Sequence, residues 1–195
     1  MKKEISSFAE DVQQAVNALK NGGTLLYPTD TIWGIGCDAS NVKAIKKVHK
    51  LKERPLSKNM IILVEDKARL EHHVREVPET LCDLIQSVNK PLSIIFPHAR
   101  NLPKELIADD GTIAIRITQH PFCKAMITQL GHPLVSTSAN LSGSPAPTSF
   151  ETISQQIRER VNHIVPSSYE TKGNNLTAST LIRLHSDGTF EVLRR

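Results

Sequence analysis

The pattern of apolar and polar residues along the chain predicts five helices. Residues 8–20 favour a helix, and the glycine pair at 22–23 ends it. In residues 41–53 apolar side chains recur at helical spacing until Pro55, whose ring disfavours helical backbone in the preceding residue. The other three predicted helices cover residues 78–89, 121–130 and 150–161.

Short apolar runs between these helices predict strands. The last two runs are separated by the turn Ser186-Asp187-Gly188, so we expect them to form an antiparallel hairpin. Strands and helices intermix along the chain, which predicts a mixed sheet with helices packed on it. The length of 195 residues fits one domain, residues 1–195. The predicted strands are TLLYP (24–28), IWGIG (32–36), MIILV (60–64), LSIIF (92–96), TIAIRIT (112–118), PLVS (133–136), STLIRL (179–184) and TFEVLR (189–194).

The composition is that of an ordinary globular protein, with 39% hydrophobic and 23% charged residues. No stretch approaches the roughly 20 apolar residues needed to span a bilayer, and the first residues lack the apolar core of a secretion signal. The three cysteines are far apart and no H-E-x-x-H motif occurs, so we expect neither a disulfide framework nor a metal site with protein ligands. These features predict a cytoplasmic protein with no membrane partner.

Basic residues concentrate in one part of the chain, between positions 43 and 58. Lys52 falls at the edge of the apolar face of the helix predicted there, so it is directed inward, and it needs an anionic partner because an unpaired buried ammonium is costly. A structural carboxylate and a bound anion are equally good partners at this point. On the opposite face of the helix we interpret four lysines as solvated: Lys43, Lys46, Lys47 and Lys50.

The strand at 112–118 places Thr112 and Arg116 on one face, together with Ala114 and Thr118. If helices cover both faces of the sheet, that face must open into a polar cavity. A guanidinium and a hydroxyl there suit a phosphate or a carboxylate. The alternative is a half-exposed sheet face with Arg116 in water.

A run of small hydroxyl residues follows the strand at 133–136. The segment STSANLSGSPAPT (136–148) offers Ser and Thr side chains and the backbone N–H groups of small residues, which together can surround a polyphosphate. The P-loop motif G-x-x-x-x-G-K-[ST] is absent from the chain. The alternative is an ordinary turn rich in Ser, Gly and Pro.

Five segments in order along the chain resemble the YrdC/TsaC family of L-threonylcarbamoyladenylate synthases. They are YPTDTIWGIGCDA (27–39), LKERP (51–55), IAIRIT (113–118), STSANLSGSPAPT (136–148) and AST (178–180). The resemblance implies an α+β (mixed α/β) fold, with a YrdC-like twisted mixed sheet, helices on both faces and a basic cavity. It implies that L-threonine, bicarbonate and ATP, as substrate, react to form threonylcarbamoyl-AMP and pyrophosphate. Mg²⁺ would be carried by the phosphates, and partner proteins would then modify adenosine 37 of tRNA.

The resemblance also implies roles for single residues. Lys52 and Arg54, the K-x-R pair, are expected to act in catalysis on the ATP phosphates. Lys58 and Leu63 depart from the family pattern, where an asparagine and a histidine are common, so a different carbamoyl or acyl substrate stays open. The chain resembles the short form of the family, and the sequence names no general base. ATP is expected at Arg54, Lys58, Thr112, Ser136, Ser138, Asn140 and Arg194, and threonine at Thr31, Arg116 and Ser179.

The main alternative of another class is a non-catalytic protein of the same fold that binds double-stranded RNA or tRNA. Only the solvated lysine face favours it. Aromatic residues, on which bases stack, make up 4% of the chain.

Overall fold

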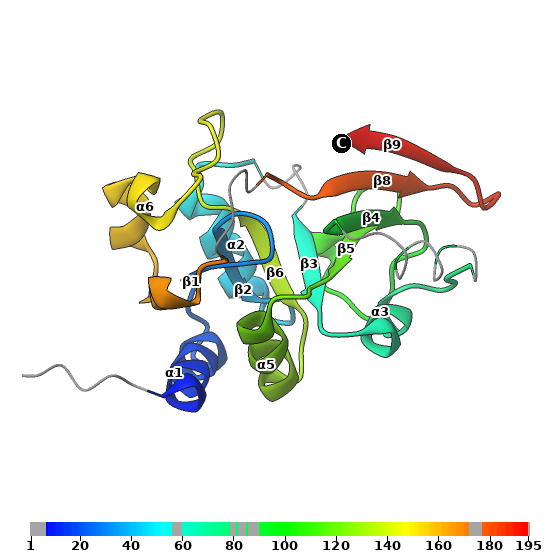
Figure 1. Ribbon diagram of the computed structural model, residues 1–195. Helices are drawn as coiled ribbons and strands as arrows, with labels where there is room; N and C mark the ends of the chain where they lie inside the picture. Colours follow the sequence, from blue (N-terminus) through cyan, green and yellow to red (C-terminus); the bar gives the residue numbers. More distant parts are fainter. Residues whose placement is uncertain are drawn as a thin grey trace, which may run out of the picture.

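The computed structural model describes residues 7–55, 60–78, 81, 85, 90–171 and 177–194. Its centre is a nine-stranded mixed sheet with helices packed on both of its faces (Figure 1). The strands are β1 (Leu25–Tyr27), β2 (Gly34–Asp38), β3 (Ile61–Val64), β4 (Leu92–Phe96), β5 (Ile113–Ile117), β6 (Leu134–Ser138), β7 (His163–Ile164), β8 (Thr180–Leu184) and β9 (Phe190–Arg194). The helices are α1 (Phe8–Lys20), α2 (Val42–Leu51), α3 (Lys67–His73), α5 (Pro121–Leu130) and α6 (Gln155–Arg160).

The strands lie side by side in the order β7-β1-β2-β6-β3-β5-β4-β8-β9. Three neighbouring pairs are parallel, namely β1 with β7, β3 with β5 and β4 with β8. The other pairs are antiparallel, including the hairpin of β8 and β9. The predicted mixed sheet and the predicted C-terminal hairpin are therefore confirmed.

Successive side chains of the central strands enter different cores, because they point to opposite faces of the sheet. On one face α1 and α5 pack against Leu25, Tyr27, Leu63 and Leu134. On the other face α2 packs against the neighbours of those residues in the same strands, such as Leu26, Ile62 and Val135. Each face is thus covered by helices, as expected.

The predicted helix at 78–89 lies largely outside the described residues. Elsewhere the observed elements differ from the predicted ones in two respects. The predicted helix at 150–161 is two short pieces, a 3-10 turn (Phe150–Thr152) followed by α6. Strand β7 and helix α3 were not predicted from the sequence, because two and seven residues are too few to establish a period.

The end of α2 sets the direction of two basic residues. The N–H of Arg54 donates to the carbonyl of His49 at 3.0 Å, and the N–H of Glu53 donates to that of Lys50 at 3.2 Å. These two bonds form a Schellman motif, in which the residue after the C-cap adopts the left-handed conformation. Glu53 adopts it, with φ of +52°. The chain therefore reverses between Lys52 and Arg54, and the two side chains leave it in different directions.

Glycine at position 36 allows strands β2 and β6 to approach without a side chain between them. A Cβ there would lie 2.0 Å from the carbonyl oxygen of Val135 and 3.0 Å from the ring of Tyr27. No larger residue fits this close approach. The ring of Tyr27 occupies the space that side chains at Gly34 and Gly36 of β2 would fill, next to the strand ends that line the candidate site.

Among the residues that the structure describes, no helix is long and apolar enough to cross a membrane.

Candidate active site

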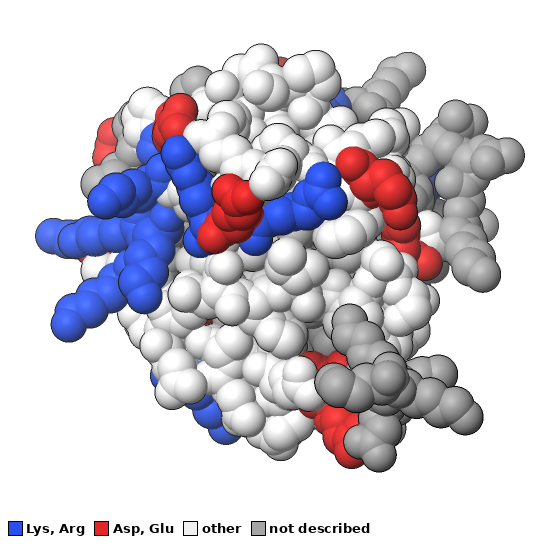
Figure 2. All heavy atoms as spheres, turned by 90° about the vertical axis from the view of Figure 1, so that its left-hand side faces the viewer, with Lys and Arg blue, Asp and Glu red and all other residues white. Residues whose placement is uncertain are grey.

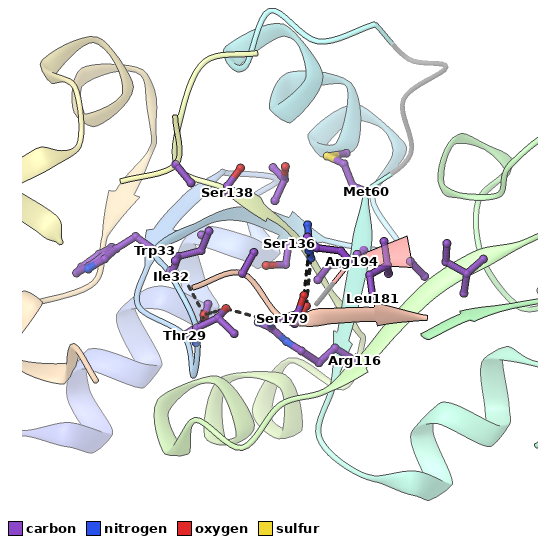
Figure 3. Close-up of a pocket in the computed structure, with 18 of the residues that line it drawn as sticks. Thr29, Ile32, Trp33, Met60, Arg116, Ser136, Ser138, Ser179, Leu181 and Arg194 are labelled. Carbon is purple, nitrogen blue, oxygen red and sulfur yellow. Dashed lines mark hydrogen bonds between the residues drawn. The ribbon is translucent and has the colours of Figure 1, made fainter. Parts of the chain in front are cut away.

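A cavity of about 390 Å³ opens where several strands end (Figure 3). Its wall is made by residues far apart in the sequence, from the turn after β1 to the last strand, β9. The strand residues Gly34, Ile61, Ala114 and Ser136 point into it from the face that α1 and α5 cover farther along the sheet. The cavity therefore occupies the part of this face that the two helices leave open.

Arg116 forms the floor of the cavity. Its side chain is only 3% exposed, as β5 alternation predicts for a residue on the inner face. Its Nη1 donates to the hydroxyl of Thr31 at 2.9 Å, and its Nη2 lies 3.2 Å from a carboxylate oxygen of Asp30. The predicted polar cavity is present, and Arg116 faces it rather than bulk water.

The hydroxyl of Thr31 is held in a fixed orientation by Thr29. Thr29 donates its only hydroxyl hydrogen to the carbonyl of Ile32 at 2.7 Å, so it accepts in its 2.9 Å contact with the Thr31 hydroxyl. Thr31 therefore donates to Thr29 and accepts from Arg116. Its remaining lone pair can only accept, which favours an N–H or O–H group of a ligand at this point.

Arg194 enters the cavity from β9. Its Nε donates to the carbonyl of Ser179 at 3.0 Å, and its Nη2 lies 3.4 Å from the Ser179 hydroxyl. That hydroxyl also bonds the buried Ser93 hydroxyl at 2.8 Å. Burial lowers the pKa of Arg194, and the nearby positive charge of Arg116 lowers it further. Two guanidinium groups close enough to repel each other indicate a site for an anion.

The hydroxyl-rich segment that begins within β6 also lines the cavity. Ser136, Thr137 and Ser138 of β6 contribute to its wall, as does Ala146 farther along the segment. Arg54 lines the cavity as well, and burial lowers its pKa. This part of the wall presents hydroxyls and one guanidinium, the groups that bind phosphate oxygens.

Lys52 is directed inward as predicted, but it does not line the cavity. Its side chain is 2% exposed, and its Nζ donates to the carbonyl of Asn140 at 2.7 Å and to the carbonyl of Ser138. The amide oxygen of Asn140 lies 3.4 Å from the same Nζ. Neither expected kind of partner, a carboxylate or a bound anion, is therefore needed, because neutral oxygens of the loop surround the ammonium.

Two other residues singled out in the sequence, Thr112 and Leu63, do not line the cavity. The hydroxyl of Thr112 donates to Asp110 at 2.7 Å outside the cavity wall, because β5 begins only at Ile113. Leu63 is fully buried in the core beside α1 and α5, so it does not meet a ligand in the cavity. Lys58 lies outside the described residues. The predicted solvated face of α2 is confirmed, since its four lysines are exposed.

The pattern of apolar and polar residues did not indicate the roles of several residues of the site. Asp30 and Thr29 act through contacts in an irregular turn, and Ser93 sits in an otherwise apolar strand. Trp33 lines the cavity, but it packs against Phe150 with ring centroids 5.0 Å apart and donates to Glu170 at 2.6 Å. The indole is thus held in place within the protein.

Charged side chains on the outer surface are arranged differently from those that line the cavity. On the face shown in Figure 2, Lys and Arg side chains gather at one side, whereas acidic side chains are spread over the face. Within α2, Lys46 lies 3.6 Å from Glu105 and Lys47 donates to the carbonyl of Gly22 at 2.7 Å. These contacts fit the interpretation of a solvated helix face.

The chain was compared with families and with individual proteins. The family described as Telomere recombination (Sua5_yciO_yrdC) matches residues 17–195. A threonylcarbamoyl-AMP synthase from Pseudoalteromonas translucida is 34% identical over 173 residues, which are 87% of this chain and 91% of that protein. One from Vibrio parahaemolyticus is 33% identical over 189 residues, 95% of this chain and 99% of the relative.

Solved structures have the same fold. P. abyssi Sua5 complexed with L-threonine superposes with a TM-score of 0.86 at 25% identity; the match covers 98% of this chain and 55% of that one. E. coli YciO superposes with a TM-score of 0.79 at 22% identity, over 97% of this chain and 90% of the other. The predicted YrdC-like fold is therefore confirmed.

Proposed function

The chain belongs to the Sua5/YciO/YrdC family, and on that basis we propose that it is a threonylcarbamoyl-AMP synthase, a nucleotidyltransferase. Its substrates are L-threonine, bicarbonate and ATP, and its products are threonylcarbamoyl-AMP and pyrophosphate. The observation that carries this proposal is the convergence of three guanidinium groups on one cavity, those of Arg54, Arg116 and Arg194. No carboxylate is among the described residues that line it. Such a wall suits a substrate pair with a polyphosphate and a carboxylate.

ATP binds at the part of the cavity formed by the end of β6 and the segment that follows it. Ser136 and Ser138 donate hydroxyl hydrogens to the phosphates, and Arg54 and Arg194 offset their charge. Asn140 belongs to the same segment, and Lys58 of the K-x-R region adds a further cation. The support for this arrangement is that Arg54 and the two serines line the same cavity; Thr112, which does not line it, has no direct contact in this arrangement.

L-threonine binds at the floor of the cavity. The carboxylate pairs with Arg116, and Ser179 lies beside it, next to Arg194. The hydroxyl of Thr31, which can only accept further hydrogen bonds, receives an N–H of the amino acid. Support comes from the contacts of Thr31 and Arg116, and the Sua5 structure that superposes on this chain was solved with L-threonine.

The reaction needs no covalent intermediate with the protein. The neutral threonine amine forms a bond to the carbon of carbon dioxide and releases a proton to solvent, or it forms that bond to the carbon of bicarbonate with loss of water. An oxygen of the resulting carbamate then forms a bond to the α-phosphorus of ATP. The bond from that phosphorus to the pyrophosphate oxygen breaks. The fixed arginines and hydroxyls hold the two substrates in line and stabilise charge as it develops on the leaving pyrophosphate.

Mg²⁺ is carried by the ATP phosphates, because the described cavity wall offers hydroxyls and guanidinium groups rather than carboxylates. When bound it offsets negative charge on the phosphates. The role of the protein residues is to bind and orient the nucleotide around it. The product then serves the modification of adenosine 37 of tRNA in the cytoplasm through separate transfer proteins.

Pyrophosphate release tests the proposal. Purified protein with ATP and Mg²⁺ is expected to release pyrophosphate only when L-threonine and bicarbonate are both present, with each omitted in turn. Equal release with serine or without an amino acid would contradict the threonine assignment and favour another carbamoyl or acyl substrate. Absence of release together with binding of double-stranded RNA would favour the non-catalytic alternative.

A further inference from the structure

The K-x-R motif consists of Lys52 and Arg54, and the S-x-N motif of Ser138 and Asn140. In each motif one residue lines the cavity and the other does not. Arg54 and Ser138 line the cavity. Lys52 and Asn140 do not; Nζ of Lys52 instead contacts the backbone carbonyl and the amide oxygen of Asn140. Alternate residues of the motifs therefore face the cavity and the protein interior.

All the hydrogen-bonding groups of the Lys52 side chain are used inside the protein. An ammonium has three N–H donors and no acceptor. Three oxygens surround Nζ, the carbonyls of Ser138 and Asn140 and the amide oxygen of Asn140. An ammonium held this way has no donor left for a phosphate in the cavity, and its side chain is 2% exposed.

Asn140 is equally occupied. While its two oxygens accept from Lys52, its Nδ2 donates to the carbonyl of Leu141 at 3.0 Å and to the carbonyl of Ser144. The side chain thus connects the ammonium to the turn that follows it. None of its polar atoms is directed at the cavity wall, which Asn140 does not join.

The backbone of the same loop is anchored on both sides. The N–H of Ala139 donates to the carbonyl of Trp33 at 3.0 Å, and the N–H of Ser142 donates to the carbonyl of Lys52 at 3.0 Å. Lys52 therefore binds the loop with its side chain and with its own carbonyl. This double attachment fixes the direction of the Ser138 side chain.

We propose that Lys52 and Asn140 are positioning residues, which hold the 138–142 loop so that Ser138 and Arg54 contact the nucleotide. In this arrangement, which rests on the proposed function for its ligand, the Lys52 ammonium acts from behind the loop. It draws the loop carbonyls inward, away from the phosphates, and leaves the hydroxyl side facing them. Lys52 is thus not itself a phosphate ligand.

The charges around Lys52 allow a second measurement. Burial, together with the neighbouring guanidinium of Arg54, lowers its pKa to about 8. The loop 138–142 contains no titratable side chain, and the end of α2 adds His49 and Glu53. Loss of the Lys52 proton as the pH rises above about 8 removes the positive charge and one of the three N–H donors, and this weakens the hydrogen bonds to the two loop carbonyls.

Amide hydrogen exchange without ligand tests the proposal. Lys52→Met keeps the length of the side chain and removes the ammonium. We expect exchange at the Ala139 and Ser142 amides to become faster by about tenfold or more. The reason is that loss of a hydrogen bond to a charged group lowers the free energy of local opening by enough to change the exchange rate by that factor. Lys50→Met, an exposed change of the same kind on the same helix, should leave exchange and activity unchanged.

ATP titration of the same variants completes the test. Lys52→Met should weaken ATP binding together with the faster exchange, whereas Arg54→Met should weaken ATP binding with exchange unchanged. Weaker ATP binding by Lys52→Met at an unchanged exchange rate would overturn the proposal, because Lys52 would then contact the phosphates directly. Faster exchange with unchanged ATP affinity would overturn it as well.

Hydrogen exchange in a second variant, and its pH dependence in the wild-type chain, test the proposal further. If Lys52→Met does not fold, Asn140→Ala should speed exchange at the same two amides by a smaller factor, and no change there would contradict the proposal. In the wild-type chain, exchange corrected for its intrinsic pH dependence should quicken at these amides above pH 8. Failure of the chain to release pyrophosphate would reject the proposed function alone, since exchange is measured without substrates.

Discussion

Asp30 and Arg116 form a buried ion pair in which Oδ1 of the carboxylate lies 3.2 Å from Nη2 of the guanidinium. The other carboxylate oxygen accepts from the backbone N–H of Gln119 at 2.9 Å. Asp30 is thereby fixed between β5 and the turn after β1, and it holds Arg116 from one side. The other side of the guanidinium is left for the hydroxyl of Thr31 and for a ligand.

Asp30→Asn should destabilise the protein by about 3 kcal/mol, because it leaves the buried guanidinium of Arg116 without a counter-charge. A urea titration measures the free energy of unfolding. The double variant Asp30→Asn/Arg116→Met should recover part of the loss, since the unpaired charge is then gone. An Asp30→Asn variant as stable as the wild type would show that the ion pair has no such role.

Thr29→Val should raise the KM for L-threonine about tenfold and leave the KM for ATP nearly unchanged. The change keeps the shape of the side chain but removes the acceptor that orients the Thr31 hydroxyl and the acceptor of the Thr31 N–H at 3.0 Å. Steady-state kinetics with each substrate varied measures both constants. Thr29→Ser, which keeps the hydroxyl, should restore threonine binding; equal effects of Val and Ser would contradict the orienting role.

Ser138→Ala should weaken ATP binding roughly ten- to a hundredfold, since a hydrogen bond to a charged phosphate contributes about 1.5–3 kcal/mol. The melting temperature without ligand should barely change. Ser142→Ala is the control, because its side chain is exposed farther along the same loop. Calorimetric titration and a thermal melt compare the two variants. Unchanged ATP affinity in Ser138→Ala would reject the loop as a nucleotide site.

Glu53→Gly should stabilise the protein by about 0.5–1 kcal/mol. Glu53 has a φ of +52°, and glycine adopts this left-handed conformation without the steric cost that other residues meet there. The variant loses the contact of Glu53 with Arg160 at 3.0 Å, but exposed ion pairs contribute little. Urea unfolding gives the change, and Glu53→Ala should be less stable than Glu53→Gly.

Acid should destabilise the protein through its buried histidines. Burial lowers the pKa of His73 to about 4 and also lowers those of His49, His120 and His163. The unfolded chain binds protons near pH 6.5 while these residues stay neutral in the folded state, so the free energy of unfolding should fall as the pH decreases from about 6.5 to 4. Urea midpoints across that range measure the fall. His73→Gln should reduce its slope; an identical slope would contradict the prediction.

The sequence predicted the elements that carry a long or clear pattern. Helix α1 has the bounds expected from the sequence, and its start is fixed by reciprocal bonds between Ser7 and Glu10. The alternation of β5 correctly placed Arg116 toward a cavity, whereas Thr112 bonds Asp110 and does not line that cavity. Strand ends depend on tertiary packing, which a local pattern does not contain.

The sequence indicated which residues form the candidate site better than it indicated which groups they contact. The inward direction of Lys52 followed from helical spacing, but its partners are backbone carbonyls, which every residue has and no sequence pattern distinguishes. Asp30 and Thr29 lie in a turn whose geometry depends on distant residues such as Gln119. The binding roles of all these residues remain predictions that the variants above test.

The position of Arg194 on the last strand has a consequence during protein synthesis. The ribosome makes the Thr29 turn early and Arg194 after every other residue that lines the cavity. An unfinished chain therefore lacks one wall of the cavity, however well its earlier strands have folded. A chain that ends before β9 should therefore lack the guanidinium that Arg194 contributes to the cavity and should bind anionic ligands there less tightly.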